Sequence, residues 1–272
     1  MQECTKNLLR LLEAAERTDI PVYEGANRPM LRTPNIAHFV HGADAFGGIG
    51  WPEPEAKPQQ GRAATELVER IMASPREITL IALGPLTNIA LALMLEPRIA
   101  QSLAGLYLMG GAVFTHGNSS EVASANLYND PEAAAIVYQS GAPIVQVGLD
   151  VCRKLWVDGD SLRRIWAANT PTTRLLKAIT PTLMAFEQSA HGYLSGEGVY
   201  YNDLPAIGYA IQPELFTSEQ YYVRISVHDE LTRGQTLVDV GRLRDAQPNA
   251  SVLLDVRTRE MLHLFVSRLS NK

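Results

Sequence analysis

A cluster of polar side chains in the stretch SANLYNDPEAAA, residues 124–135, raises the first chemical question. Asn126, Asn129 and Asp130 stand directly before a run with helix composition. Asp130 followed by Pro131 is a strong N-cap and first-turn pair, so we interpret Asp130 as structural. Asparagine amides can instead hydrogen-bond a ligand. Cap chemistry and ligand chemistry are therefore both open for this stretch.

Further polar residues follow the ends of predicted strands, where open α/β sheets bind their ligands. Four segments carry them: VHGADAFGG (40–48), GPLTN (84–88), MGGAVFTHGN (109–118) and NDLPAIGYAIQPELF (202–216). The last begins with Asn202 and Asp203 at the start of an apolar helix. Because the carboxyl ends of parallel strands meet at one edge of a sheet, these segments are candidates for a common site.

Each of these residues also has a purely structural interpretation. Thr87 or Asn88 can satisfy backbone donors in a tight turn from strand to helix, and Asp203 can cap the helix that follows it. A single histidine in a glycine-rich loop, such as His41, is more often solvated than functional. No residue of this group is decisive when taken alone.

Several classes of function lack their motifs. The sequence contains no GxxxxGK[ST], no GxGxxG after a strand, no GxSxG and no HExxH, which argues against nucleotide binding, serine hydrolysis and zinc proteolysis. The net charge is -5 and no basic stretch suits a phosphate backbone, so nucleic acid is not an expected partner. A small neutral polyhydroxyl ligand bound through asparagine side chains remains.

Apolar strands alternate with helices along the chain. We predict helices at 5–16, 63–73, 86–95, 130–140 and 257–269, strands at 20–25, 78–83, 103–111 and 143–151, a strand pair at 221–229 and 235–240, and a mainly helical region at 158–216. This order predicts an α/β fold with a mostly parallel central sheet and helices on both faces, in one domain over residues 1–272. The Pro/Gly-rich stretch 46–61 is expected to be a long surface loop that could serve as a lid.

A membrane span is the alternative for ITLIALGPLTNIALALML, residues 78–95, which is uncharged and about long enough to cross a bilayer. Gly84 and Pro85 interrupt it, and the halves differ: a β-branched run comes first, then an Ala/Leu-rich run. We interpret it as a buried strand followed by a buried helix, and expect no membrane partner. The two isolated cysteines, Cys4 and Cys152, favour a reduced, cytoplasmic protein.

Taken together, the quoted segments resemble the inosine-uridine nucleoside hydrolase family. The matching phrases are DIPVYEGANRPM (19–30), VHGADAFGG (40–48), IALGPLTNIALAL (81–93), LYLMGGAVFTHGNSSEVASANLYNDPEAA (106–134), VGLDV (147–151) and NDLPAIGYAIQPELF (202–216). They occur in the family's order and cover nearly the whole chain. The resemblance implies a nucleoside N-ribohydrolase, in which bound Ca²⁺ holds the ribose diol and the attacking water and the N-glycosidic bond breaks through an oxocarbenium-like transition state.

The resemblance also assigns roles to individual positions. Leu83 would give a backbone carbonyl, and Asp203 a carboxylate, to the metal. Met109, Asn118 and Asn126 fall on ribose-contacting positions, and His41 falls beside the nucleobase.

Three positions depart from the family's pattern. Ser124 and Ala125 stand where the family has Glu and Phe, so a ribose-binding carboxylate and an apolar wall are replaced. Asn202 stands where many members carry a histidine proposed to protonate the leaving base, and asparagine cannot act as that acid.

The largest departure is at the start of the sequence. The family opens with a strand that ends in an Asp-rich DxDPGxDD motif, followed by a second strand, and this chain has neither; the general base is therefore absent and the N-terminal strands are expected to be missing. Calcium takes six to eight oxygen ligands. Asp203, the Leu83 carbonyl and a sugar diol do not reach that number, so we expect weak or absent Ca²⁺ binding.

Two functions follow from this comparison. The first is hydrolysis of ribonucleosides to ribose and free base. The alternative is a catalytically inert relative that binds a nucleoside or a ribose-like ligand, and an unrelated sugar-binding module is the least favoured reading. The expected partner is a small-molecule nucleoside, and the expected assembly is a homodimer or homotetramer.

Overall fold

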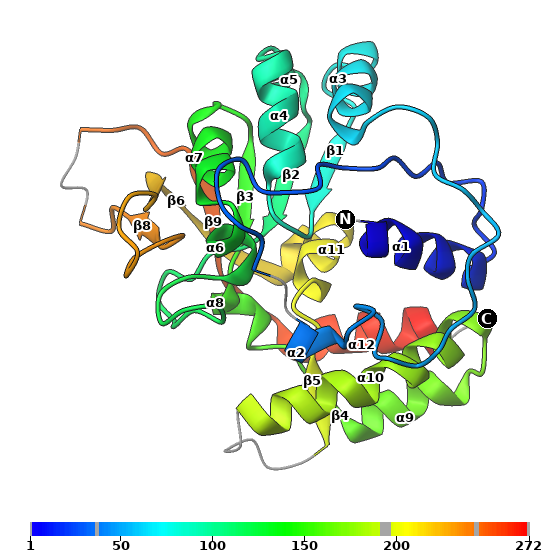
Figure 1. Cartoon of the computed structure of the whole chain (residues 1–272). Coiled ribbons are helices and arrows are strands. Elements are labelled where there is room, and N and C mark those ends of the chain that lie inside the picture. Colours follow the sequence, from blue (N-terminus) through cyan, green and yellow to red (C-terminus); the bar gives the residue numbers. More distant parts are fainter. Residues whose placement is uncertain (1, 36–37, 191–196, 242–244, 271–272) are drawn as a thin grey trace.

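The central feature of the computed structural model is a five-stranded sheet with the order β1-β2-β3-β9-β6. The structure describes residues 2–35, 38–190, 197–241 and 245–270. The strands are β1 (Thr79–Ala82), β2 (Gly105–Met109), β3 (Ile144–Val147), β9 (Ala250–Val256) and β6 (Phe216–Tyr221). The first four are parallel and β6 runs antiparallel to β9. The mostly parallel sheet predicted from the sequence is therefore confirmed (Figure 1).

Alternate side chains of the strands enter two separate cores, because successive residues of a strand point to opposite faces. On one face Leu106 and Leu108 pack with α3 (Ala63–Ala73), α4 (Thr87–Leu95) and α7 (Pro131–Gln139). On the other face Met109 and Val147 pack with α8 (Leu149–Cys152) and α11 (Leu204–Ile211). Helices therefore cover both faces, which explains why β2 and β3 are continuous apolar runs.

A second layer of helices lies below the sheet in the view of Figure 1. It contains α9 (Gly159–Ala167), α10 (Pro171–Ala190) and α12 (Thr258–Ser270), and α1 (Gln2–Ala14) and the short α2 (His38–His41) contact α10. The remaining elements are α5 (Ile99–Ser102), the 3-10 turn η1 (Pro213–Leu215), and two small antiparallel pairs, β4 (Trp156–Asp158) with β5 (Gly198–Tyr200) and β7 (Val223–Ile225) with β8 (Thr236–Val238).

Most predicted elements are present within a few residues of their expected bounds. The apolar segment 78–95 is β1 followed by α4, and no helix in the described ranges is both long and apolar enough to cross a membrane. The predicted strand pair near the C-terminus is β7 and β8. The Pro/Gly-rich stretch 46–61 has neither helix nor strand, as expected for a loop.

One prediction about an element was wrong. Residues 20–25 form no strand: the carbonyls of Val22 and Glu24 accept the backbone N–H groups of Gln59, in an irregular loop, and of Ala63, the first residue of α3. The region 158–216 is mainly helical, as predicted, with α9, α10 and α11, although β5 interrupts it and β6 begins at its end. The strand β9 was not predicted at all.

Candidate active site

A cavity of about 450 Å³ opens at the carboxyl ends of β1 and β2. Seven of the eight predicted site residues line it: His41, Leu83, Met109, Asn118, Asn126, Asn202 and Asp203. They come from segments as distant in sequence as residues 41 and 203. Parallel strands bring four of them together, because Leu83 follows β1, Met109 ends β2, and Asn118 and Asn126 lie on the connection after β2. His41 reaches the cavity from α2, and Asn202 and Asp203 reach it from the segment between β5 and α11.

Asn126 ties the two strand ends together. It lies on α6 (Ala125–Asn129), and its Nδ2 donates to the carbonyl of Met109 at 2.9 Å and to that of Leu83 at 3.3 Å. Both amide hydrogens are therefore directed at the protein backbone. Because an amide also carries an acceptor oxygen with two lone pairs, Oδ1 is the atom that Asn126 can offer to a ligand hydroxyl.

The loop after β2 is held by two charged residues of the α8 segment. Asp150 accepts the N–H groups of Val113 at 3.0 Å and Phe114 at 2.7 Å. Arg153 donates to the side chain of Thr115 at 2.7 Å and to the carbonyls of residues 116 and 117 at 2.6 and 2.8 Å. The next residue, Asn118, is thereby fixed at the cavity.

Asn118 and Ser124 both hold α6 in place, but only Asn118 also lines the cavity. The Oδ1 of Asn118 accepts the N–H of Ala125 at 2.8 Å, so its amide group anchors α6 while the residue lines the cavity. Ser124 is fully buried and does not line the cavity; its hydroxyl accepts the N–H of Gly111 at 2.7 Å. The expected contact of Ser124 with a ligand therefore needs correction, because its oxygen is occupied in joining α6 to the loop after β2.

Asp130 is a structural residue, as its helix-cap interpretation predicts. It is fully buried, and its Oδ1 accepts the N–H of Ala133 in the first turn of α7 at 3.1 Å. Its Oδ2 accepts the N–H of Met30 at 3.0 Å and the hydroxyl of Thr87 at 2.6 Å. Asn88 is structural as well, with its Oδ1 accepting the N–H of Ala26 at 2.8 Å.

Asp203 behaves differently, although it also stands at a helix start. Its backbone is already helical, with φ -84° and ψ -14°, and its side chain makes no cap hydrogen bond. The carboxylate lines the cavity, where it is exposed to the cavity's interior. The surrounding walls reduce its contact with water, and this partial desolvation raises the pKa of Asp203 to about 6.

The opposite wall comes from the helical layer, and its α10 residues were not predicted from the sequence. Leu183, Phe186 and Glu187 line the cavity from α10, and His41 lines it from the end of α2. Spacings of three and four residues place the three α10 side chains on one helix face. Desolvation lowers the pKa of His41, so the imidazole is neutral at pH 7.

The side-chain donors at the cavity decide whether a metal ion fits there. Among the described residues no three His, Cys, Asp or Glu side chains come together as a metal-binding group. The carboxylates at the cavity are those of Asp203 and Glu187, and Asp150 nearby is already bonded to two N–H groups. Six to eight oxygen ligands are normal for Ca²⁺. The described residues therefore do not form a complete calcium site.

The chain was compared with known proteins. The sequence profile described as inosine-uridine preferring nucleoside hydrolase matches residues 1–263. The chain belongs to this family. The pyrimidine-specific ribonucleoside hydrolase RihA of Salmonella gallinarum is 34% identical over 268 residues, which cover 98% of this chain and 85% of that protein.

Solved structures of nucleoside hydrolases superimpose on the whole fold. The plant nucleoside hydrolase PpNRh1 has a TM-score of 0.92 at 30% identity, covering 100% of this chain and 87% of the plant enzyme. The purine-preferring ribonucleoside hydrolase of Gardnerella vaginalis has a TM-score of 0.91 at 28% identity, covering 99% and 86%. The nucleoside hydrolase family thus accounts for both the sequence and the fold, and its reaction is hydrolysis of the ribonucleoside N-glycosidic bond.

Proposed function

We propose that the cavity binds a ribonucleoside with its ribose against the wall formed by Asn118, Asn126 and Asp203, and its base against the wall formed by His41 and α10. The observation that carries this proposal is Asp203, a carboxylate at a helix start that makes no cap bond and faces the cavity. Above pH 6 it is an acceptor for sugar hydroxyl groups, which are donors that a ribose presents in pairs.

The base end of the ligand suits the opposite wall. Phe186 and Leu183 offer apolar surface to a flat heterocycle, while His41 and Glu187 offer polar atoms to its edge. RihA is named for pyrimidine nucleosides and the Gardnerella vaginalis enzyme for purine nucleosides. We propose ribonucleosides as the substrate class, with the choice of base decided at the α10 wall.

A divalent metal is proposed as part of the site, with Asp203 and the Leu83 carbonyl as the donors that this chain supplies. Ca²⁺ is the metal we favour, because all of these donors are oxygen atoms. The donor set of the described residues is incomplete, so no step of the reaction is derived through the metal.

The reaction requires the base to leave as the N-glycosidic bond breaks, and the negative charge on the base must be neutralised. Asn202 lines the cavity but carries no transferable proton, and its backbone carbonyl accepts the thiol of Cys152 at 3.2 Å. The neutral imidazole of His41 is a poor acid. We therefore expect slow hydrolysis of substrates whose leaving group needs a proton.

Two substrates test this expectation. p-Nitrophenyl riboside releases a phenolate that needs no proton, so it should be hydrolysed faster than inosine or uridine by the unmodified chain. Asn202→His should raise kcat/KM for inosine by about a hundredfold, the usual contribution of a general acid, and leave p-nitrophenyl riboside unchanged. Ribose release with Ca²⁺ present is the measurement.

The control variant is Asn129→His, which adds an imidazole to another residue of the cavity lining. An equal gain on both substrates, or an equal gain in both variants, would contradict the proposed position of the leaving base. Binding of inosine by calorimetry without release of ribose from either substrate would favour the ligand-binding alternative.

A further inference from the structure

The β7–β8 pair and its connecting turn, residues 223–238, form a hairpin that contributes no residue to the cavity lining. It nevertheless touches three segments that do line the cavity. The three contacts are with α6, with the loop after β2 that leads to Asn118, and with the segment that leads to Asn35. We refer to residues 223–238 as the buttress hairpin.

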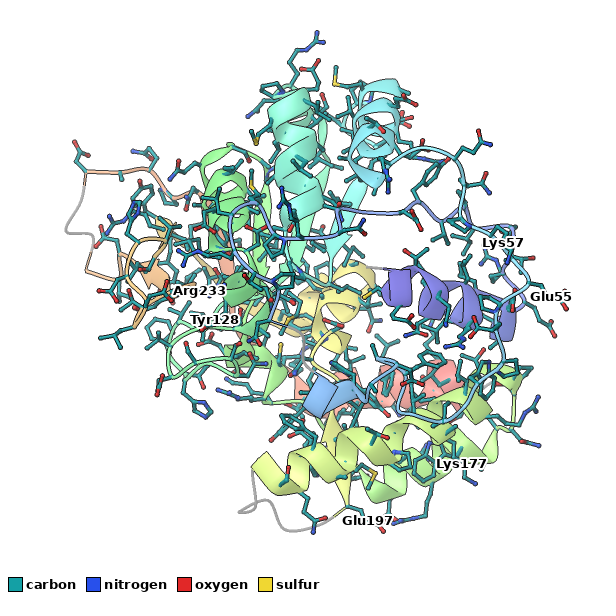
Figure 2. The ribbon with its side chains drawn as sticks, viewed as in Figure 1. Glu55, Lys57, Tyr128, Lys177, Glu197 and Arg233 are labelled. Carbon is teal, nitrogen blue, oxygen red and sulfur yellow. The ribbon has the colours of Figure 1, made fainter. Side chains whose placement is uncertain are left out.

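The first contact is with α6, the helix that carries Asn126 and Asn129. Gly234 has φ +73°, and a Cβ built on it would lie 2.7 Å from both the backbone N and the Cα of Tyr128. Arg233 stacks its guanidinium on the ring of Tyr128, 4.3 Å from the ring centre (Figure 2). The Nε and Nη2 atoms of Arg233 are buried and have no hydrogen-bond partner within the described ranges. The electron-rich face of the Tyr128 ring is therefore the group that stabilises this part of the guanidinium.

The second contact is with the loop after β2. The hydroxyl of Thr236, a buried residue of β8, accepts the N–H of Ala112 at 3.1 Å. Ala112 lies three residues after Met109, and the same loop continues to Asn118 at the cavity. The hairpin thereby satisfies a backbone donor that the turn from strand to loop leaves without a strand partner.

The third contact is with the segment that leads to Asn35, a residue of the cavity lining. Arg32 donates to the carbonyl of Val227 at 2.6 Å and forms ion pairs with Glu230 of the hairpin turn at 2.6 Å and with Glu132 of α7 at 2.9 Å. The N–H of Asn35 is bonded in turn to the side chain of Asn129 at 2.9 Å. One wall of the cavity is therefore fixed from behind at three points.

We infer that the buttress hairpin is a positioning element for the ribose-side wall, and that Gly234 and Arg233 set the place of α6 and hence of Asn126. The inference deepens the proposed function, on which its ligand-binding consequence rests. Both residues act through α6 and neither touches the substrate. A change far from the reacting atoms that misplaces a group of the site by about 1 Å can reduce the rate of the reaction about a hundredfold.

The test compares two glycines that have the same left-handed backbone. Gly234→Ala and Gly141→Ala carry a similar cost for placing a side chain on a left-handed backbone, because Gly141 has φ +77°. They differ in their neighbours, since a Cβ at Gly141 meets only the flexible end of Gln101, at 3.1 Å. In Gly234→Ala we expect faster amide hydrogen exchange in residues 124–130, where the N–H of Tyr128 is bonded to the carbonyl of Ser124 at 2.8 Å. In Gly141→Ala this segment should exchange as in the unmodified protein.

A second pair of variants isolates the stacking contact. Tyr128→Phe retains the ring under Arg233, and Tyr128→Leu removes it. We expect the leucine variant to raise KM for the ribonucleoside about tenfold or more, with a smaller change in kcat, and the phenylalanine variant to keep both values. Tm measured on every variant separates a shift of α6 from general unfolding.

The outcomes distinguish this inference from the proposed function. If the unmodified chain neither binds nor hydrolyses ribonucleosides, the proposed function fails, while hydrogen exchange at residues 124–130 still tests the hairpin. Equal exchange in Gly234→Ala and Gly141→Ala would overturn the inference. So would a Tyr128→Leu variant with unchanged exchange and unchanged KM.

Discussion

Asp130 and Asp203 both stand just before a proline-containing helix start, yet only Asp130 caps its helix. The backbone explains the difference. Asp130 has φ -144° and ψ 72°, outside the helical region, so its carboxylate can reach the N–H of Ala133. Asp203 already has helical angles, which direct its side chain away from the first turn and leave it for the cavity.

The cap at Asp130 was predictable from the sequence, whereas the sequence left both a helix cap and a ligand contact open for Asp203. Asp-Pro fixes the first helical residue, since proline prefers that position. Asp-Leu-Pro allows the helix to begin at either of two residues, and the choice depends on packing between α11 and β2 that no local pattern encodes.

The raised pKa of Asp203 gives a prediction at the scale of this residue. Because the pKa in the folded protein, about 6, lies above the value of about 3.9 in an unfolded chain, the folded state binds the proton more tightly. Stability contributed by this group is present below pH 4 and is lost as the pH rises to 6. Asp203→Asn should therefore stabilise the ligand-free protein at pH 7 and have no such effect at pH 4.

The expected gain is about 1 kcal/mol, or up to about 3 °C in Tm, once the carboxylate's contact with solvent in the cavity is allowed for. Chemical denaturation at both pH values is the measurement. Asp245→Asn removes an exposed carboxylate and serves as the control. A gain for Asp203→Asn that is equal at pH 4 and pH 7 would show that ionisation is not its cause.

At the scale of elements, one buried carboxylate joins three segments that are far apart in sequence. Asp130 caps α7, accepts the hydroxyl of Thr87 at the start of α4, and accepts the N–H of Met30. Its removal leaves buried donors without partners, so the cost exceeds that of an ordinary helix cap.

Asp130→Ala should lower the free energy of unfolding by about 3 kcal/mol or more. Asp158→Ala is the matched control: Asp158 caps α9 through the N–H of Ser161 at 2.7 Å, but it is exposed, and its hydrogen bonds to Ser161 and Asp160 stay within its own helix start. That variant should lose about 1 kcal/mol. Equal losses in urea denaturation would contradict the joining role of Asp130.

Elements with a long periodic pattern were predictable, and elements defined by their partners were not. Helix α3 begins and ends at the predicted residues, because its apolar and charged positions repeat with helical spacing. The segment 20–25 has strand composition but lacks a strand beside it. Strand β6 has four exposed residues in succession, so no apolar alternation marked it in the sequence.

At the scale of the whole molecule, β1 is the edge strand of the main sheet, next to β2. Exposed apolar side chains occur on two helices at this end of the sheet: Leu8 and Leu11 on α1, and Ile207 and Ile211 on α11 (Figure 1). An open parallel edge with apolar neighbours favours association with another chain. The expected homodimer or homotetramer stays a prediction, and this end of the sheet is where we expect contact.

Sedimentation should therefore show association that rises with protein concentration. Ile211→Lys, at a side chain that is 50% exposed, should weaken it, because a lysine at a contact must be desolvated. Leu231→Lys changes a side chain that is 84% exposed in the turn of the buttress hairpin, and should leave association unchanged. A monomer at all concentrations, or equal weakening by both variants, would contradict this placement.

The whole-molecule arrangement also decides how much of the site was predictable. Polar residues after strand ends could be collected from the sequence, because parallel strands share one carboxyl edge. The α10 wall could not, since Leu183, Phe186 and Glu187 belong to a helix whose approach to that edge is set by long-range packing. Their spacing of three and four residues marks a helix face but not what it faces.

The bond between Cys152 and the carbonyl of Asn202 has a practical consequence. Cys152 is buried, and its burial raises the pKa of the thiol, so a thiol reagent should label it only when α8 separates from residue 202, which lines the cavity. Cys4 is exposed on α1 and reacts without any such opening. The chain thus carries its own reference label and its own reporter, and the ratio of their labelling rates records how often the contact between α8 and residue 202 opens in solution.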